Sequence, residues 1–207
     1  MSTVLRPAWF QRSSPIVAPA LLGCTLVRQF ANGDRLQGQI VETEAYAPDD
    51  PACHAYRKRT ERNGAMFAAG GQSYVYLIYG MYHCFNVVTD AEGVGSAVLV
   101  RAIDLQPHPL LEPLLSNAAG KSRKSPLSRL AAGPGKLCKA LRIDRTLNDR
   151  PLTPESGLWL EARSPELDEA IESGATGVVQ TTRIGLSQGQ EYPWRWYLQD
   201  SPAVSKP

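Results

Sequence analysis

The feature that most constrains the fold of this chain is a series of short runs rich in aromatic and β-branched residues, each closed by a turn signal. The expected strands are 25–30, 36–46, 73–79, 82–89 and 96–103. The turn signals are Asn32-Gly33-Asp34, Gly80-Met81 and Asp90-Ala91-Glu92-Gly93. Because such short turns join antiparallel neighbours, we expect an antiparallel meander at the centre of the fold.

Helical signals lie on either side of these runs. The expected helices are 15–23, which stops at Gly23, 137–142, and a polar helix or linker over 166–171. Residues 51–67 are expected to form a loop with one helical turn near His54. Later strands are expected at 158–162, 182–186 and 194–198.

The composition is that of an ordinary globular protein, with 43% hydrophobic and 20% charged residues among 207. One domain over 1–207 accounts for this length, with 1–15 expected to be loosely ordered. A net charge of +2 does not by itself indicate nucleic acid, so such a partner must be argued from local clusters. Four separated cysteines indicate reduced thiols. The absence of an apolar signal core or a membrane-length apolar run favours a cytoplasmic protein.

Two carboxylates lie close together in the run 36–46. Glu42 and Glu44 are two residues apart, so both are expected on one strand face with Tyr46, and Thr43 on the other. A carboxylate in a cleft can act as a general base on water. The alternative is a solvated strand face, which is the commoner interpretation of an isolated Glu-x-Glu pattern. The pattern alone does not choose between the two glutamates.

The tyrosines indicate a contact surface. Tyr74 and Tyr76 share a strand face, whereas Tyr79 is expected at the tip of the hairpin. A large aromatic side chain exposed at a hairpin tip often marks a contact surface. Tyr46 and Tyr76 could line a flat slot for a planar ligand, although core packing is the better interpretation for most tyrosines taken singly.

Metal and nucleotide sites have little support in the sequence. His54, His83 and Cys53 match no common zinc spacing. Gly133-Pro134-Gly135-Lys136 lacks the rest of a phosphate-loop pattern, although a helix that opens near Lys136 could still hold a backbone phosphate. The cationic runs that could form a basic face for DNA or RNA, or else remain solvated loops, are 57–62, 121–124 and 136–142.

A set of ordered sequence blocks runs through nearly the whole chain, from about Leu21 to Ser205. The first are Val41-Glu42-Thr43-Glu44-Ala45-Tyr46, Asp50-Pro51-Ala52-Cys53-His54, Arg62-Asn63-Gly64-Ala65-Met66-Phe67 and Tyr74-Val75-Tyr76-Leu77-Ile78-Tyr79-Gly80-Met81. Later ones are Asn86, Arg101-Ala102, Gly133-Pro134-Gly135-Lys136-Leu137-Cys138, Arg183-Ile184-Gly185 and Trp194-Arg195-Trp196-Tyr197. Together they strongly resemble the alkyladenine (3-methyladenine) DNA glycosylase family.

The resemblance implies an α/β fold of the α+β type. The expected structure is a single compact domain with a curved antiparallel β-sheet surrounded by helices, similar to a formyltransferase C-terminal domain. The implied activity is that of a monofunctional DNA repair enzyme, which flips alkylated or deaminated purines out of double-stranded DNA. A glutamate-activated water then hydrolyses the N-glycosidic bond and leaves an abasic site. The resemblance implies no metal, no other cofactor, no membrane and a monomer, and we expect a bacterial, cytoplasmic, nucleoid-associated protein.

The same resemblance assigns roles to individual residues. Glu44 is implied as the general base, which settles the choice over Glu42, and Arg101 as a group that holds the water, with the main chain of Ile184 as a third contact. The implied substrate-binding residues are Tyr46, His54, Tyr76, Met81, Asn86 and Ile184. Asn86 would exclude the amino group of normal guanine. The implied DNA-binding residues are Tyr79 as a wedge, Arg59, Arg62, Asn63 and Lys136.

Two other classes of protein remain open. A non-catalytic lesion- or nucleic-acid-binding module on the same fold would keep Tyr79 and the cationic runs but would have no use for Glu44. A metal-dependent hydrolase would use His54, Cys53 and Glu44, and a chelator would abolish its activity. Gly135 stands where some relatives have Ser, so a hydroxyl contact at that position is not expected here.

Overall fold

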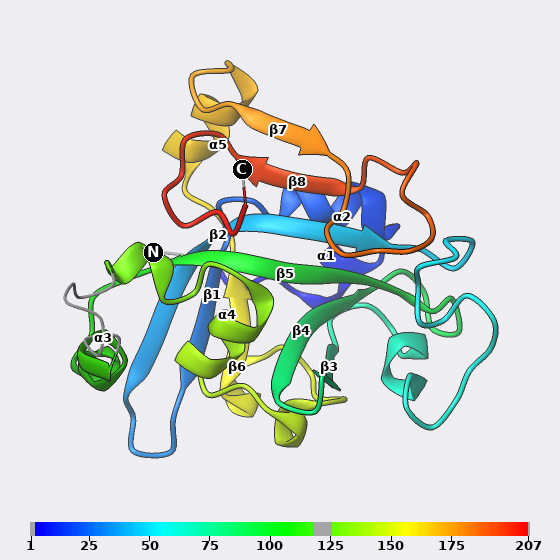
Figure 1. Cartoon of the computed structure of the whole chain (residues 1–207), viewed down its shortest axis with the longest axis horizontal. Helices are drawn as coiled ribbons and strands as arrows, with labels where there is room; N and C mark the ends of the chain where they lie inside the picture. Colours follow the sequence, from blue (N-terminus) through cyan, green and yellow to red (C-terminus); the bar gives the residue numbers. More distant parts are fainter. Residues whose placement is uncertain (1–2, 118–125, 207) are drawn as a thin grey trace.

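A single antiparallel sheet organises the molecule (Figure 1). The computed structural model describes residues 3–117 and 126–206. Its strands are β1 Thr25–Gln29, β2 Arg35–Tyr46, β3 Ser73–Ile78, β4 Tyr82–Thr89, β5 Ser96–Leu105, β6 Leu158–Glu161, β7 Val178–Thr181 and β8 Arg195–Leu198. The main order is β3-β4-β5-β2-β1-β6, and the β7–β8 pair joins it through β2. Every pairing between these strands is antiparallel.

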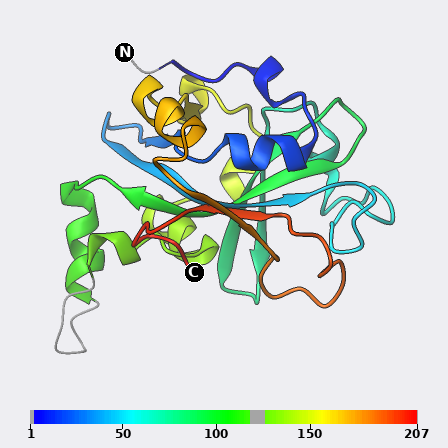
Figure 2. The ribbon, with the colours of Figure 1, turned by 90° about the horizontal axis from the view of Figure 1, so that it is seen from above.

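The helices are short and lie on both faces of the sheet (Figure 2). They are α1 Pro7–Phe10, α2 Ser14–Ala20, α3 Glu112–Asn117, α4 Pro134–Ala140 and α5 Pro165–Glu172. The 3-10 turns are η1 Gly64–Phe67, η2 Pro109–Leu111, η4 Leu127–Arg129, η5 Arg145–Leu147 and η6 Pro154–Ser156. The fold class predicted from the sequence, an α+β domain with a large antiparallel sheet, is confirmed. Its likeness to a formyltransferase C-terminal domain stays a prediction.

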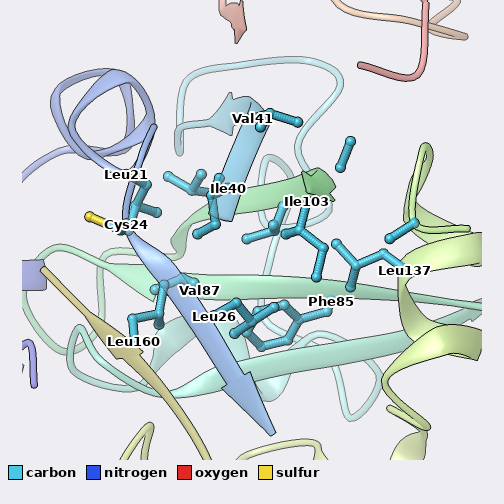
Figure 3. Close-up of a cluster of buried hydrophobic side chains, with 14 of the residues drawn as sticks. Leu21, Cys24, Leu26, Ile40, Val41, Phe85, Val87, Ile103, Leu137 and Leu160 are labelled. Carbon is cyan, nitrogen blue, oxygen red and sulfur yellow. The ribbon is translucent and has the colours of Figure 1, made fainter. Parts of the chain in front are cut away.

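The core lies between these helices and the strands (Figure 3). Leu21, at the end of α2, and Leu137 of α4 lie on opposite sides of the strand residues Ile40 and Ile103. All four side chains are almost completely buried. Burial of each such aliphatic side chain contributes roughly 1.5–3 kcal/mol. The core therefore holds the long strand β2 in a fixed position from both sides.

Strand β2 is the longest element, and it changes partners along its length. One edge pairs with β5 from Gly38 to Tyr46, whereas the other pairs first with β1 and then, over residues 42–44, with β8. Two shifts of register flank Glu42 in the pairing with β5. A β-bulge of this kind bends a strand and re-aims its side chains. The bend lies where the sequence places its two carboxylates.

Most of the predicted sheet is confirmed, but the prediction of one strand is wrong. Residues 182–186 form no strand, and the strand before them is β7. The chain leaves the sheet there because Arg183 is buried in an ion pair with Asp50 and the Ile184 amide donates to Glu44. The loop expected over 51–67 is confirmed, but the helical turn expected near His54 is wrong, because the 3-10 turn of this segment is η1. The helix expected at 137–142 begins earlier, at Pro134, and ends at Ala140.

The remaining N-terminal residues and the thiols lie against this framework. Val4 bridges to Glu161 beside β6, and Leu5 and Phe10 are buried. All four cysteines are free and buried, in agreement with the prediction of reduced thiols. No helix in residues 3–117 or 126–206 is long and apolar enough to cross a bilayer. The cationic run 121–124 lies outside the described residues.

Candidate active site

Strand β2 presents Glu42, Glu44 and Tyr46 on one face of the sheet, as predicted. Thr43 points the other way, where its hydroxyl donates to the Ala18 carbonyl oxygen of α2 at 2.9 Å. Both carboxylates are completely buried, so neither belongs to a solvated strand face. A buried carboxylate requires compensating hydrogen bonds or charges, and the contacts of the two glutamates distinguish them.

Glu44 is held by three groups that come from different parts of the chain. Its Oε1 accepts a hydrogen bond from the Ile184 amide at 2.8 Å and lies 3.1 Å from an Arg101 guanidinium nitrogen. Its Oε2 accepts from the Tyr46 hydroxyl at 2.8 Å. An ionised carboxylate has about four acceptor positions, so Glu44 retains capacity for a further donor such as water.

Glu42 is saturated by protein donors. Its Oε1 accepts from Arg101 Nε, Arg195 Nε and the Ser205 hydroxyl at 2.8–2.9 Å, and its Oε2 accepts from the Ser205 amide at 2.7 Å. Burial alone would raise the pKa of Glu42, but the charge of Arg101 and the bonds from Ser205 and Arg195 outweigh it and lower the pKa. Glu42 therefore orients Arg101 and is not available to activate water.

A small cavity opens next to Tyr46, whose hydroxyl donates to Glu44, although neither glutamate is among the residues that line it. It encloses about 150 Å³ and is lined by Tyr46, Ala52, His54, Met66, Tyr74, Tyr76, Ile78, Asn86 and Leu186. Sites for drug-sized ligands occupy roughly 300–1,000 Å³, so this cavity suits a single small planar group. Aromatic rings form much of its wall: Tyr76 lies 4.7 Å from His54 and 5.3 Å from Tyr74 between ring centroids. Tyr46 and Tyr76 both line the cavity, and the flat slot between them stays a prediction.

His54 and Asn86 add polar groups to the cavity. His54 Nδ1 lies 2.9 Å from the Tyr74 hydroxyl, and Asn86 Nδ2 donates to the Tyr74 carbonyl oxygen at 3.0 Å. Burial, aided by the charge of Arg62, lowers the pKa of His54, so its ring is neutral near pH 7. Burial also raises the pKa of Tyr74 to about 12 and that of Tyr46 well above its usual value. These rings therefore present uncharged, electron-rich faces.

The support behind Tyr46 was not predicted from the sequence. Arg183 lies with its guanidinium carbon 4.7 Å from the Tyr46 ring centroid and is paired with the buried Asp50. The pair fixes the backbone just before Ile184, whose amide holds Glu44. No periodic pattern could reveal this contact, because the two paired residues are 133 positions apart.

The β3–β4 hairpin projects next to the cavity mouth, where Ile78 lies. Tyr79 is 83% exposed and Met81 67% exposed, so both stand in solvent at the tip. Tyr79 has φ 52 and Gly80 has φ 69, both in the left-handed region that a tight turn requires. The predicted position of Tyr79 at the tip is confirmed. Met81 stands beside it and is not among the residues that line the cavity.

The cationic residues near the cavity have different environments. Arg57, Lys58 and Arg62 line a second, more open cavity of about 440 Å³ that shares His54 and Tyr74 with the first. Arg59 lies over the Phe67 ring, 5.8 Å from its centroid. Asn63 is buried, and its side chain bonds to the backbone of Thr60, His54 and Lys58. Asn63 therefore shapes the cationic loop from within.

Lys136 lies near the same hairpin. A Cβ on the preceding residue, Gly135, would lie 3.1 Å from the ring of Tyr82, so this part of α4 packs closely on the hairpin next to its tip. Lys136 lines a small surface hollow with Arg129 and Lys139. The cationic runs 57–62 and 136–142 thus approach the hairpin from two elements.

Within residues 3–117 and 126–206, no three His, Cys, Asp or Glu side chains come close enough to hold a metal ion. His54 bonds to Tyr74, and the Cys53 thiol contacts the Gly95 carbonyl oxygen. The donor set expected of a metal-dependent hydrolase is therefore not assembled in the described part of the chain.

Comparison with known proteins agrees with this geometry. The family model described as methylpurine-DNA glycosylase matches residues 8–202. This chain belongs to the methylpurine-DNA glycosylase family. Relatives with the provisional name 3-methyladenine DNA glycosylase include one from Trichodesmium erythraeum, 52% identical over 203 residues that make up 98% of both chains. Others come from Synechococcus sp. (52% identical, 95% of this chain and 96% of the relative) and Herpetosiphon aurantiacus (47%, 99% and 90%).

Membership of the methylpurine-DNA glycosylase family confirms the resemblance inferred from the sequence blocks. It identifies the protein as a DNA glycosylase, a glycosidic hydrolase of DNA repair. The individual roles inferred for Glu44, Arg101, the cavity residues and the wedge are not decided by the family match.

Proposed function

We propose that this protein flips alkylated or deaminated purines out of duplex DNA and hydrolyses their N-glycosidic bond, with Glu44 as general base. The substrate class comprises 3-methyladenine, 7-methylguanine, hypoxanthine and ethenoadenine. The observation that carries the proposal is the position of Glu44 beside an aromatic cavity that suits one planar base. Glu42 cannot take this role because its acceptor positions are occupied.

Base flipping costs a few kcal/mol, and least for damaged or mismatched bases. Stacking of the flipped base between aromatic side chains returns roughly 1–3 kcal/mol. In this proposal Tyr46, Tyr76 and His54 hold the base, and Asn86 obstructs the amino group of normal guanine. 7-Methylguanine carries the same amino group, but its weakened glycosidic bond still allows its release. Tyr79 enters the gap left in the duplex, and Met81 lies beside it against the DNA. The cations Arg59, Arg62 and Lys136 face the phosphates, while Asn63 keeps the loop in shape.

The chemical step follows from the neighbours of Glu44. Water bound between Glu44, Arg101 and the Ile184 main chain attacks the sugar C1′, and Glu44 takes the proton. The glycosidic electron pair leaves with the base, so a cationic purine such as 7-methylguanine departs as a neutral molecule. A neutral purine such as hypoxanthine or ethenoadenine takes up a proton from solvent as it leaves. No amine nucleophile is required, so the product is an abasic site in an intact strand.

The alternative is a lesion-binding protein without catalysis. Such a protein would need the aromatic cavity and Tyr79 but would gain nothing from a buried Glu44 whose donors leave room for water.

A single-turnover assay of base release distinguishes the proposed glycosylase from a non-catalytic lesion-binding protein. The substrates are duplex oligonucleotides with ethenoadenine or hypoxanthine and methylated genomic DNA, with a chelator present throughout. The wild-type protein should release damaged bases. Glu44→Gln should lower the rate of release at least a hundredfold, in line with loss of a general base. Asp34→Asn, in the β1–β2 turn, is the control and should retain full activity. Tight binding to lesion DNA without release from any substrate would leave the binding protein as the answer.

A further inference from the structure

A buried ion pair lies against the ring of Tyr46, and neither of its residues lines the cavity. Asp50 is completely buried and accepts hydrogen bonds from both terminal nitrogens of Arg183. The Arg183 guanidinium carbon lies 4.7 Å from the centroid of the Tyr46 ring. Tyr46 lines the cavity, whereas Arg183 and Asp50 do not. The ring therefore separates the ion pair from whatever stacks on it.

The charge of Arg183 bears on the charge of the ligand. A cation over one face of an aromatic ring polarises the π electrons toward itself and so weakens the attraction of a cationic ligand to the other face. An N-alkylated purine such as 7-methylguanine is cationic in DNA, whereas hypoxanthine and ethenoadenine are neutral. A guanidinium behind Tyr46 without a counter-charge would therefore weaken the binding of cationic purines and leave the binding of neutral purines nearly unaffected.

Asp50 supplies the balancing charge. The other hydrogen bonds of Arg183 go to the carbonyl oxygens of Ala45 and Gly189, both at 2.9 Å, which carry no net charge. A Cβ at Gly189 would lie 2.6 Å from Asp50 Oδ1, so the backbone closes tightly over the pair. With both side chains shut away from solvent, water screens their fields little.

We propose that Asp50 is a specificity-determining residue: by neutralising Arg183 behind Tyr46, it allows the cavity to accept cationic alkylated purines as well as neutral ones. This inference rests on the proposed function, because it concerns which damaged bases that activity releases. Asp50 and Arg183 act through Tyr46 and do not touch the substrate.

The size of the effect follows from the geometry. A base stacked on Tyr46 would lie roughly 8–10 Å from the guanidinium, since Arg183 is 4.7 Å from the ring centroid on the other side. Two like charges at that separation, at an effective dielectric constant of about 20, repel by an amount equivalent to a factor on the order of ten. The ratio of cationic to neutral substrate should change by about this factor when Asp50 loses its charge.

The test compares single-turnover release of 7-methylguanine and of ethenoadenine from the same duplex. Asp50→Asn should lower the ratio of the two rates by about tenfold, because Arg183 stays charged. Arg183→Gln should raise the ratio, because Asp50 is then a negative charge behind Tyr46 without its counter-charge. The double variant, which lacks both charges, should return the ratio close to the wild-type value. Asp168→Asn, which removes the partner of Arg163 on α5, is the matched control and should leave the ratio unchanged.

The outcomes separate this inference from the proposed function. If wild type releases neither base, the proposed function fails. If wild type releases both and Asp50→Asn lowers both rates equally, the pair has only a structural role and the inference is wrong. If Asp50→Asn does not fold, a rise of the ratio in Arg183→Gln would support the inference, and a lower or unchanged ratio would overturn it.

Discussion

Replacement of Glu42 by Gln should destabilise the protein far more than the same change at Glu44, two residues away. Glu42 accepts hydrogen bonds from Arg101, Arg195 and twice from Ser205. Among the described residues it is the only carboxylate within ion-pair distance of Arg195. Glu44, by contrast, shares Arg101 with Glu42, so its loss leaves no guanidinium without a carboxylate.

The magnitude follows from these contacts. Removing one partner of a buried ion pair costs about 3–5 kcal/mol because the other charge stays buried. At a urea m-value of about 2 kcal/mol per M, Glu42→Gln should lower the unfolding midpoint by roughly 2 M. Glu44→Gln keeps the Ile184 hydrogen bond to an amide oxygen and should cost about half as much or less.

The assay is urea unfolding followed by circular dichroism, at pH 7 and again at acid pH. The lowered pKa of Glu42 means that its charge stabilises the fold above about pH 4.5, its usual value, and that this contribution is lost as pH falls through the lowered pKa. The stability gap between wild type and Glu42→Gln should therefore narrow below about pH 4.5. Equal midpoints for Glu42→Gln and Glu44→Gln at pH 7 would refute this account of the network.

Other parts of the site give three further predictions. Arg62→Ala should raise the pKa of His54 partway back toward 6.5, because the charge of Arg62 adds to burial in lowering it; an unchanged NMR titration would contradict this. Tyr79→Gly should leave the urea midpoint unchanged or higher, because glycine adopts φ 52 without the cost of roughly 1–2 kcal/mol paid by other residues, yet it should slow lesion release. Asn86→Ala should allow release of normal guanine, measured against unmodified adenine in the same duplex, and a variant that still ignores guanine would remove Asn86 from that role.

The sheet was predictable because its information is local. Alternating side chains and turns such as Asn32-Gly33-Asp34 specify β1, β2 and the β3–β4 hairpin within a few residues. The same alternation placed Glu42, Glu44 and Tyr46 on one face. These features depend on neighbours in the sequence, so a single chain reveals them.

The surroundings of the carboxylates could not be predicted, because they come from distant residues. Ser205 reaches Glu42 across 163 positions, and Arg183 reaches Asp50 across 133. The strand expected at 182–186 failed for the same reason: a buried ion pair outweighed a local preference for strand. The DNA contact that the resemblance implies for Asn63 stays a prediction, and the bonds from its amide to the backbone of His54 and Lys58 could not be predicted.

The four buried thiols have a chemical consequence for a protein that works on alkylated DNA. Thiolates, not thiols, react with alkylating agents. Burial raises the pKa of Cys24 and Cys53 to about 11 and that of Cys84 and Cys138 above the usual value, so all four stay protonated and shielded from water. The cysteine thiols are therefore protected from the alkylating agents that create the proposed substrates in DNA. The enzyme can then survive the exposure that makes its activity necessary.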